Sequence, residues 1–497
     1  MEYKINQFNL SDIQFEDLKS LIHYFTRGIP RQKISNIYLG PNLINISLSK
    51  NKLKKSTEDK KLLSSLCQLT SSNASSFPNQ NIILFSTSFN QSQIFLKRYL
   101  HSLSSSPSSE SPLTKSALSF LSFFSSFKDE SNDYNTICDY QITISIDNSI
   151  RFESISMYQI NSYMLSNRPE EVNNINFFYM MLYNIDINEI NNFLLCDETQ
   201  KHFFIYQNND DMDDYAKRYV LINQFKIIKN DRQYNRFATS KDNASLIKEE
   251  FNYYHELYQQ YESIKETVMM SNDIETSIKG IFYAIILLNE YDVQNDVIFN
   301  EIIKRSKSTT MSSTLDVFSF IRNVIHSDEI KFSKKNHILK NIAMCLNSSE
   351  EKILFIMITV TNSKGKTKIT SNKNEIKTNI DNFVSTLYNI ALSKVQNVID
   401  SYIKNKKLIQ VSSNKKINIF IMRSNLEYEY CHCSLSLTNN PYFTISNNII
   451  DANSFIITQN AKEHAISNYI QEVKNYIYLS NAMSTSKKQN AKNKYNF

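Results

Sequence analysis

Apolar residues recur along the chain at two spacings, which together predict a protein of alternating strands and helices. Short apolar runs at 81–86 and 416–422 are typical of buried parallel strands. Helical spacing predicts helices over 92–103, 114–127 and about 379–404, and the last of these is the strongest helical pattern in the chain. Strands that alternate with helices indicate the α/β class.

Less regular patterns predict further elements. They are helices over 12–27, 170–184 and 188–195, two helices within 245–290, a strand over 42–49, and a hairpin of 141–147 and 149–155. The strand at 81–86, the turn at 87–91 and the helix that follows stand in the order in which a phosphate-binding loop occurs. This junction is therefore the first place to look for nucleotide chemistry.

Glycine is scarce in this sequence. The 497 residues include only four glycines, namely Gly28, Gly40, Gly280 and Gly365. An average soluble chain is about 7% glycine, so roughly 35 would be expected. Glycine lets backbone N–H groups surround a phosphate without a Cβ in the way. Because none of the four lies in the turn at 87–91, a normal phosphate-binding loop is not expected there.

The net charge and the length of the apolar runs limit the classes of partner that we expect. The net charge of +6 comes from 55 basic and 49 acidic residues, and the basic ones fall in short runs such as Lys52 to Lys61 and Lys487 to Lys494. Without a concentrated basic face, no nucleic-acid partner is expected. The longest strongly apolar run, Ile281 to Leu288, is too short to span a bilayer. The N-terminus lacks the features of a secretory signal, and the six cysteines are scattered, so we expect a cytoplasmic protein with reduced thiols and no membrane partner.

Five stretches, in order along the chain, resemble the head domain of myosins. The first is Ile37 to Lys50, similar to the family's I-Y-x-Y-x-G-P-x-L-I-A-V-N-P-Y-K; the second is Asn81 to Leu100, similar to the family's strand, phosphate loop and helix; the third is Leu121 to Ile144, similar to the stretch with switch I. The fourth is Tyr163 to Ser166 with Asn176 to Leu182, similar to Y-L-L-E and H-I-F-Y-Q-L-L; the fifth is Asp381 to Asp400 with Ile419 to Glu427, similar to the stretch that ends in switch II.

The resemblance implies a fold and a domain organisation. The fold would be a twisted, mainly parallel central sheet flanked by helices, of the P-loop NTPase superfamily, with long polar insertions. The head-like α/β domain would cover 1–430, followed by a relay-helix-like piece over 431–480 and a basic disordered tail over 481–497.

The residues that bind ATP in that family are largely replaced here. The loop between Phe85 and Ser92 has no glycine and no lysine, and the nearest lysine, Lys97, lies two turns into the helix. Ile137 falls where switch I has its arginine, and Met422 falls where switch II has its aspartate. The polar remnants are Ser86, Thr87, Ser88 and Ser92 of the loop, Asn132, Asn135 and Thr136 of switch I, and Asn425 and Glu427 of switch II.

These replacements predict the loss of ATP chemistry. A charge-assisted hydrogen bond contributes roughly 1.5–3 kcal/mol. Losing several would weaken phosphate binding by about three orders of magnitude. We therefore expect no catalytic residue, no cofactor and no metal, and a Glu427 that is exposed, protonated or paired elsewhere because its arginine partner is absent.

Three functional hypotheses follow. The first is a non-hydrolysing pseudo-motor that acts as a cytoskeletal interaction or scaffold module, with actin, another myosin or a further protein as its partner. The second is a divergent actin-based motor ATPase that holds Mg·ATP with Thr87, Ser88, Ser92 and Thr136. The third is an unrelated α/β interaction domain. Adjacent inner strands at 81–86 and 416–422 would favour the myosin-like fold over the third hypothesis.

Other clusters are interpreted as structural. Cys431-His432-Cys433 lacks a fourth zinc ligand, and its spacing is narrow. The acidic run from Asp210 to Asp214 lacks the glycine and the terminal glutamate of a calcium loop. The serine-rich stretch 104–111 is expected to be a flexible linker.

Overall fold

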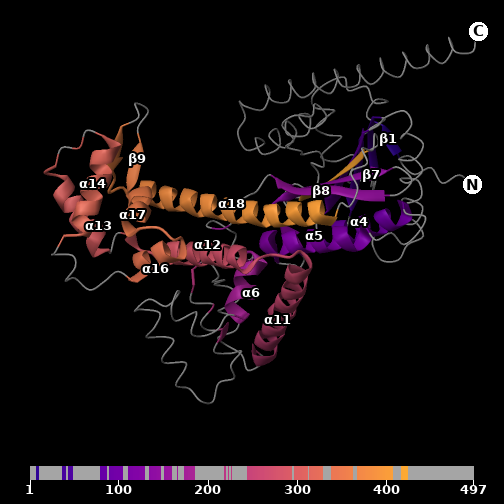
Figure 1. Cartoon of the computed structure of the whole chain (residues 1–497), viewed down its shortest axis with the longest axis horizontal. Coiled ribbons are helices and arrows are strands. Elements are labelled where there is room, and N and C mark those ends of the chain that lie inside the picture. The colour runs from indigo at the N-terminus through magenta and orange to yellow at the C-terminus, as the bar shows by residue number, and fades with distance from the viewer. Residues whose placement is uncertain are drawn as a thin grey trace, which may run out of the picture. The chain divides into compact units, whose positions relative to one another are not determined.

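The computed structural model (Figure 1) describes part of the chain, and every structural statement below concerns that part. The described segments are 7–9, 36–40, 43–48, 79–86, 89–103, 110–128, 134–146, 150–158, 165, 173–184, 218–219, 222, 225–226, 243–293, 296–309, 311, 313–327, 337–361, 366–406 and 416–423. They belong to two compact units. Unit 1 lies within Met1–Leu118, Asp133–Ile160 and Ile403–Phe497, and unit 2 within Ser119–Asn132 and Asn161–Tyr402.

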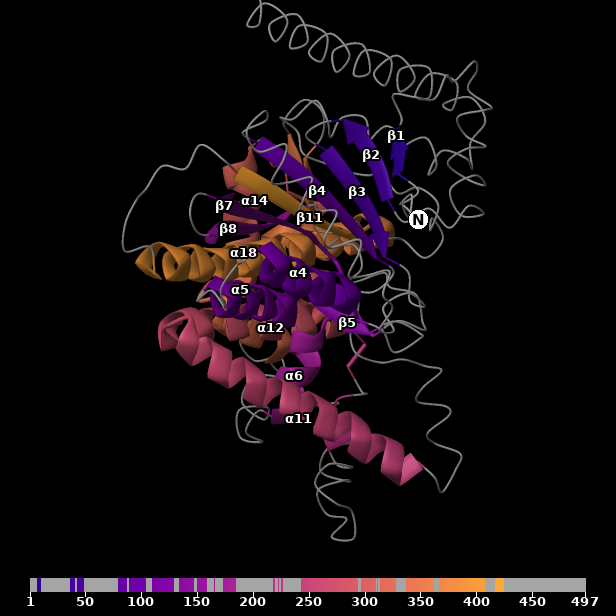
Figure 2. The same ribbon diagram turned by 90° about the vertical axis from the view of Figure 1, so that its right-hand side faces the viewer.

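Unit 1 is built on a seven-stranded sheet with the order β1-β2-β3-β4-β11-β7-β8 (Figure 2). Its strands are β1 (Gln7–Asn9), β2 (Asn36–Gly40), β3 (Leu43–Leu48), β4 (Asn79–Ser86), β7 (Asp139–Ile146), β8 (Ile150–Tyr158) and β11 (Lys416–Arg423). Ile82, Ile142 and Ile419, from three neighbouring strands, are completely buried. The middle of this sheet therefore forms the core of the unit.

The sheet is mixed, so the expectation of a mainly parallel sheet is wrong. Of its six described pairings, β1–β2, β3–β4 and β4–β11 are parallel, and β2–β3, β11–β7 and β7–β8 are antiparallel. Only the two residues Pro41 and Asn42 separate β2 from β3, and three separate β7 from β8. Connections this short can join only antiparallel strands. The broader α/β expectation is correct, because the chain combines this sheet with many helices.

Strands β4 and β11 are neighbours inside the sheet and run in parallel. Their register places Asn81 beside Asn418 and Phe85 beside Met422. Helix α4 (Phe89–Leu103) follows β4 directly and packs against β4, β11 and the short strand β6 (Tyr134–Thr136). Segments more than 300 residues apart in sequence therefore form one structural unit, in the adjacency that the myosin resemblance implies.

Unit 2 is mainly helical. Its elements are β5 (Ser126–Lys128), α6 (Asn176–Asn184), α11 (Asn243–Thr267), α12 (Asn272–Glu290), α13 (Val297–Ser306), α14 (Thr314–Ile325), α16 (His337–Cys345), α17 (Glu350–Ile358), β9 (Thr359–Thr361) and β10 (Thr367–Ile369). The chain passes between the units within α5 (Glu110–Ser125) and within α18 (Lys373–Lys406). Side-chain caps begin several helices: Asp296 caps α13, and Ser313 forms a capping box with Asp316 at the start of α14.

Aromatic side chains fill the core of unit 2. The ring of Phe177 lies 4.4 Å from that of Phe124 and 4.6 Å from that of Phe282, measured between centroids. Tyr388 of α18 packs edge-on against Phe282, and its hydroxyl donates to the backbone oxygen of Phe124 at 2.5 Å. The helix predicted most strongly from sequence is thus anchored in the centre of its unit.

Several sequence predictions have definite outcomes. The two helices within 245–290 and the hairpin at 141–155 are confirmed, and α18 extends the predicted helix at 379–404 in both directions. Helix α6 begins at Asn176, six residues later than predicted. The helices predicted over 12–27 and 188–195, and the proposed pieces at 431–480 and 481–497, lie outside the described residues. Among the described helices, none has the length and apolar character needed to cross a membrane.

Candidate functional site

The junction between β4 and α4 is the place where a phosphate loop would lie. Strand β4 ends at Ser86, which pairs in register with Arg423 of β11, and helix α4 begins at Phe89. Only Thr87 and Ser88 separate the two elements. A loop of the G-x-x-x-x-G-K-[ST] type has six residues before its lysine. Two residues leave too little backbone to surround a triphosphate with N–H groups.

Ser92 is the polar remnant that lies deepest in the protein. It stands in the first turn of α4, its side chain is 0% exposed, and its Oγ has no hydrogen-bond partner in the described structure. Most buried polar side-chain atoms in folded proteins do have a partner. An unsatisfied hydroxyl costs free energy, so Ser92 marks a place where a polar interaction is missing.

The segment that the resemblance aligns with switch I is buried, and its threonine bonds within its own turn. The Thr136 hydroxyl donates to the backbone oxygen of Cys138 at 2.9 Å and accepts from the backbone N–H of Cys138 at 3.2 Å. Asn135 and Ile137 are also buried. The Thr136 hydroxyl is thus used locally, and Ile137, which the resemblance aligns with the switch I arginine, lies in the core.

Neither Lys97 nor Met422 supplies a charge at the β4–α4 junction. Lys97 lies on the exposed face of α4, eight residues beyond its start and therefore about 12 Å along the helix axis. Met422 lies in β11 beside Phe85. Of the predicted remnants, the structure brings Ser92 and the Asn135–Thr136 pair onto the packed elements α4 and β6. Thr87, Ser88, Asn132, Asn425 and Glu427 lie outside the described residues.

A second polar cluster, which the sequence did not predict as a site, lies in unit 2 around Lys128. The Lys128 ammonium stands 3.5 Å from the centre of the Tyr253 ring and 5.8 Å from that of Tyr254. The Tyr183 hydroxyl donates to Glu250 Oε1 at 3.2 Å. The backbone oxygen of Lys128 accepts from the N–H of Asn173 at 3.1 Å. The cluster thus connects β5, α6 and α11.

Burial changes the protonation equilibria in this Lys128 cluster. It lowers the pKa of Lys128, although the charge of Glu250 acts in the opposite direction. Burial also raises the pKa of Glu250, against the effects of the Tyr183 hydrogen bond and the Lys128 charge. The pKa values of Tyr183 and Tyr254 are well above their ordinary value, first because of burial and then because of nearby charge and tyrosines. Burial thus shifts the pKa of each of these groups in the direction that favours its uncharged form.

The sequence contained a signal for this cluster. Glu250, Tyr253 and Tyr254 are spaced so that they lie on neighbouring parts of one helix. The partner Lys128, however, is more than 120 residues away, and only the packing of β5 against α11 brings it there. Lys128 coincides with a lysine in the myosin pattern, and in this structure its ammonium group lies over the rings of Tyr253 and Tyr254.

Within the described segments, no group of three or more His, Cys, Asp or Glu side chains could hold a metal ion. The clusters at 210–214 and 431–433 lie outside those segments. Comparison of the sequence with protein-family models and with curated proteins gives no match.

Proposed function

We propose that this protein is a myosin-head-like pseudo-motor, which has kept a motor scaffold, does not hydrolyse ATP, and acts as a protein-interaction module at the cytoskeleton. The observation that carries the proposal is the β4–α4 junction. A strand corresponding to the phosphate-loop strand lies beside a strand corresponding to the switch II strand, yet only two residues connect it to its helix.

The chemistry of phosphoryl transfer supports the loss of catalysis. That reaction depends on positioning and on the stabilisation of charge by a lysine, a metal ion and backbone N–H groups. At this junction the loop lysine is absent, Met422 replaces the carboxylate of switch II, and the Thr136 hydroxyl is engaged with Cys138. No cofactor is therefore assigned to the protein.

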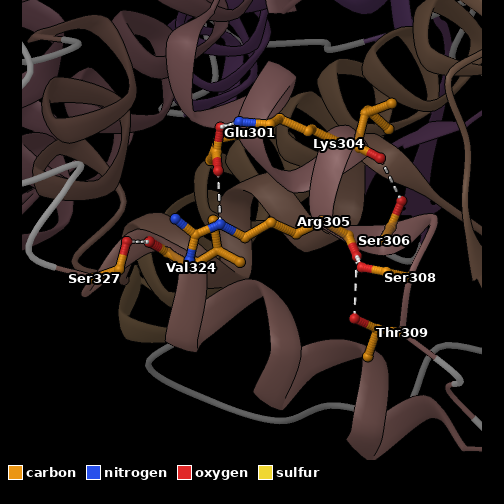
Figure 3. A network of polar contacts seen from close by, with 9 residues as sticks. Glu301, Lys304, Arg305, Ser306, Ser308, Thr309, Val324 and Ser327 are labelled. Atoms are coloured by element: carbon orange, nitrogen blue, oxygen red, sulfur yellow. Dashed lines mark hydrogen bonds and ion pairs between the residues drawn. The ribbon is translucent and has the colours of Figure 1, made fainter.

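Exposed cationic side chains in the described part of unit 2 support the protein-interaction role. Seven exposed cationic side chains lie in the described part of 297–369: Lys304, Lys307, Arg322, Lys340, Lys352, Lys366 and Lys368. Figure 3 shows how Glu301 on α13 engages two neighbouring cations, with 3.6 Å to Lys304 Nζ and 2.7 Å to Arg305 Nε. Long-range attraction would favour a partner with an acidic surface. Within the family resemblance, actin or another myosin is the partner to test first.

Co-sedimentation with actin filaments, with and without Mg·ATP, tests this function. The pseudo-motor hypothesis predicts binding that weakens with salt and does not change with ATP. Lys340→Glu combined with Lys352→Glu should weaken binding, whereas Lys377→Glu on the exposed face of α18 serves as the matched control. Absence of pelleting would contradict actin as the partner, and release by ATP would contradict the loss of nucleotide function.

One observation favours a second candidate, the divergent motor ATPase. Ser92 keeps a buried hydroxyl without a hydrogen-bond partner in the described structure, at the start of the helix that follows β4. A bound phosphate oxygen would satisfy it. In that case Ser92→Ala would weaken Mg·ATP binding, which the same co-sedimentation assay would report as a smaller effect of ATP.

A further inference from the structure

The chain leaves helix α13 through a run of cationic and hydroxyl-bearing residues. Lys304 and Arg305 lie in the last turn of this helix. The first residues beyond the helix are Lys307, Ser308 and Thr309, and all three are exposed. The Ser308 hydroxyl is therefore accessible at the surface of unit 2, and three of the four residues that precede it are cationic.

The Ser308 hydroxyl makes a hydrogen bond that the helix end does not require. Its Oγ donates to the backbone oxygen of Arg305 at 3.0 Å, and the Thr309 hydroxyl donates to the same oxygen at 3.0 Å (Figure 3). The backbone N–H of Ser308 also donates to that oxygen, at 3.2 Å. Because a carbonyl oxygen has two lone pairs, the other two donors can still satisfy it after the Ser308 hydroxyl is modified.

The cations before Ser308 have a spacing that a groove lined with carboxylates can read. Helix ends fray, so the last turn of α13 can open into an extended chain. Alternate side chains of an extended chain lie on one face, which places Lys307 and Arg305 on the same face. Charge-assisted hydrogen bonds from both would hold Ser308 in register. At the same two positions before Thr309, the chain has Ser308 and Ser306, which carry no charge.

We propose that Ser308 is a phosphorylation site for a protein kinase whose peptide-binding groove carries carboxylates. The kinase would transfer the γ-phosphoryl group of ATP to Ser308 Oγ. The Oγ–P bond forms, the bond from the γ-phosphorus to the ADP oxygen breaks, and the hydroxyl proton passes to the base of the kinase. The phosphate would add a charge of about −1.5 to −2 beside Lys304, Arg305 and Lys307. The inference concerns the end of α13 and does not depend on the pseudo-motor function.

Glu301 restrains the cations that the kinase would bind. Its carboxylate lies 2.7 Å from Arg305 Nε and 3.6 Å from Lys304 Nζ. A kinase must break these ion pairs before its own carboxylates can bind the same groups. Glu301→Gln should therefore raise the rate of phosphorylation of Ser308 by roughly two- to fivefold, the factor expected for removing an exposed ion pair.

Phosphorylation of the full chain by the catalytic subunit of the cyclic-AMP-dependent protein kinase, which binds arginine before its target serine, tests the inference. Mass spectrometry of the fragments should locate a phosphate on Ser308, which Ser308→Ala removes. Thr309→Ala should be modified at the wild-type rate. Arg305→Gln should slow modification of Ser308 about tenfold, because charge-assisted hydrogen bonds to the kinase are lost. Lys377→Gln, on the exposed face of α18, is the control and should have no effect.

Two of these variants break the same ion pair and should have opposite effects. Arg305→Gln and Glu301→Gln both remove the contact between α13 side chains, so a general loosening of the helix end would change both rates in the same direction. Slower modification of the first and faster modification of the second would support recognition of Arg305. No phosphate on Ser308, or equal rates in the two variants, would overturn the proposal.

Discussion

Two groups of polar residues in the described structure differ in the contacts that their polar atoms make. One is Ser92 with Thr136 in unit 1, and the other is Lys128 with Glu250 in unit 2. In unit 2, the Tyr183 hydroxyl meets a carboxylate and the Lys128 ammonium meets an aromatic ring. In unit 1, the Ser92 hydroxyl is buried without a partner in the described structure. The Lys128 cluster thus joins charged and aromatic groups from three elements, whereas no such contact is found for the Ser92 hydroxyl among the described residues.

This difference indicates which polar groups of the described residues contribute to stability. Unit 2 should depend strongly on its packed interior, and the junction in unit 1 should tolerate further loss of polar groups. We expect the largest effects in the aromatic core of unit 2 and the smallest at the β4–α4 junction of unit 1.

The largest effect is expected from the aromatic core of unit 2. Phe282 is fully buried, and its ring lies 4.6 Å from Phe177 and 4.9 Å from Phe178. Phe282→Ala should lower the free energy of unfolding by about 3–5 kcal/mol in urea denaturation, because it removes apolar contacts and leaves a cavity. Ile390→Ala, which truncates an exposed side chain on α18, should change it by less than about 0.5 kcal/mol. Similar effects of the two changes would contradict the packing described here.

A smaller effect is expected where α12 passes α16. A Cβ placed on Gly280 would lie 2.6 Å from the backbone oxygen of Cys345. Gly280→Ala should therefore destabilise the protein by about 1–3 kcal/mol, since a helix backbone must move. Thr276→Ala, on the exposed side of α12, should be nearly neutral by the same thermal melt. A Gly280→Ala protein as stable as wild type would show that the two helices are not this close.

The carboxyl group of Glu250 in the Lys128 cluster should make the stability of the protein depend on pH. Because burial raises the pKa of Glu250, its contribution to stability is present below its ordinary pKa of about 4.3 and is lost as pH rises through the raised value. Glu250→Gln should therefore gain stability relative to wild type as pH rises above the ordinary pKa of a glutamate, by roughly 1 kcal/mol, the usual size for a single buried polar group. Melting curves at a series of pH values measure it, with exposed Glu256→Gln as the control. A difference that is constant with pH would refute the assignment.

The smallest effect is expected at the β4–α4 junction. Ser92→Ala removes a buried hydroxyl without a partner in the described structure, so the free energy of unfolding should stay the same or rise by up to about 1 kcal/mol. Ser125→Ala is the matched change, because that buried hydroxyl donates to Leu121 O at 2.9 Å and its loss should cost about 0.5–1.5 kcal/mol. Destabilisation by Ser92→Ala equal to that by Ser125→Ala would show that Ser92 has a partner after all.

The sequence predicted those elements whose own residues determine them. The runs at 81–86 and 416–422 contain consecutive apolar residues, and both are strands within two residues of the predicted bounds. Helix α5 begins at Glu110, four residues before the predicted start, because Pro112 is compatible with the first turn of a helix. The short helices α13 and α14 were not predicted, although Asp296 and the Ser313-x-x-Asp316 capping box are visible signals for their first turns.

Other features depend on contacts between distant residues, which the periodicity of a segment cannot reveal. The apolar runs of β4 and β11 suit parallel strands, but the sheet is mixed because short connections join β2 to β3 and β7 to β8. At the junction, the sequence predicted the absence of the lysine and glycines, and the structure adds the local engagement of Thr136 and the burial of Ser92. The Lys128 cluster required the fold, because its partners come from three separate elements.

Calorimetric titration of the full chain with Mg·ATP at millimolar concentration tests the central claim most directly. The account predicts no heat of binding and no thermal shift, because two residues between β4 and α4 cannot surround a triphosphate. Saturable binding that is lost in Ser92→Ala and Thr136→Ala would contradict it and would identify the junction as a working nucleotide site.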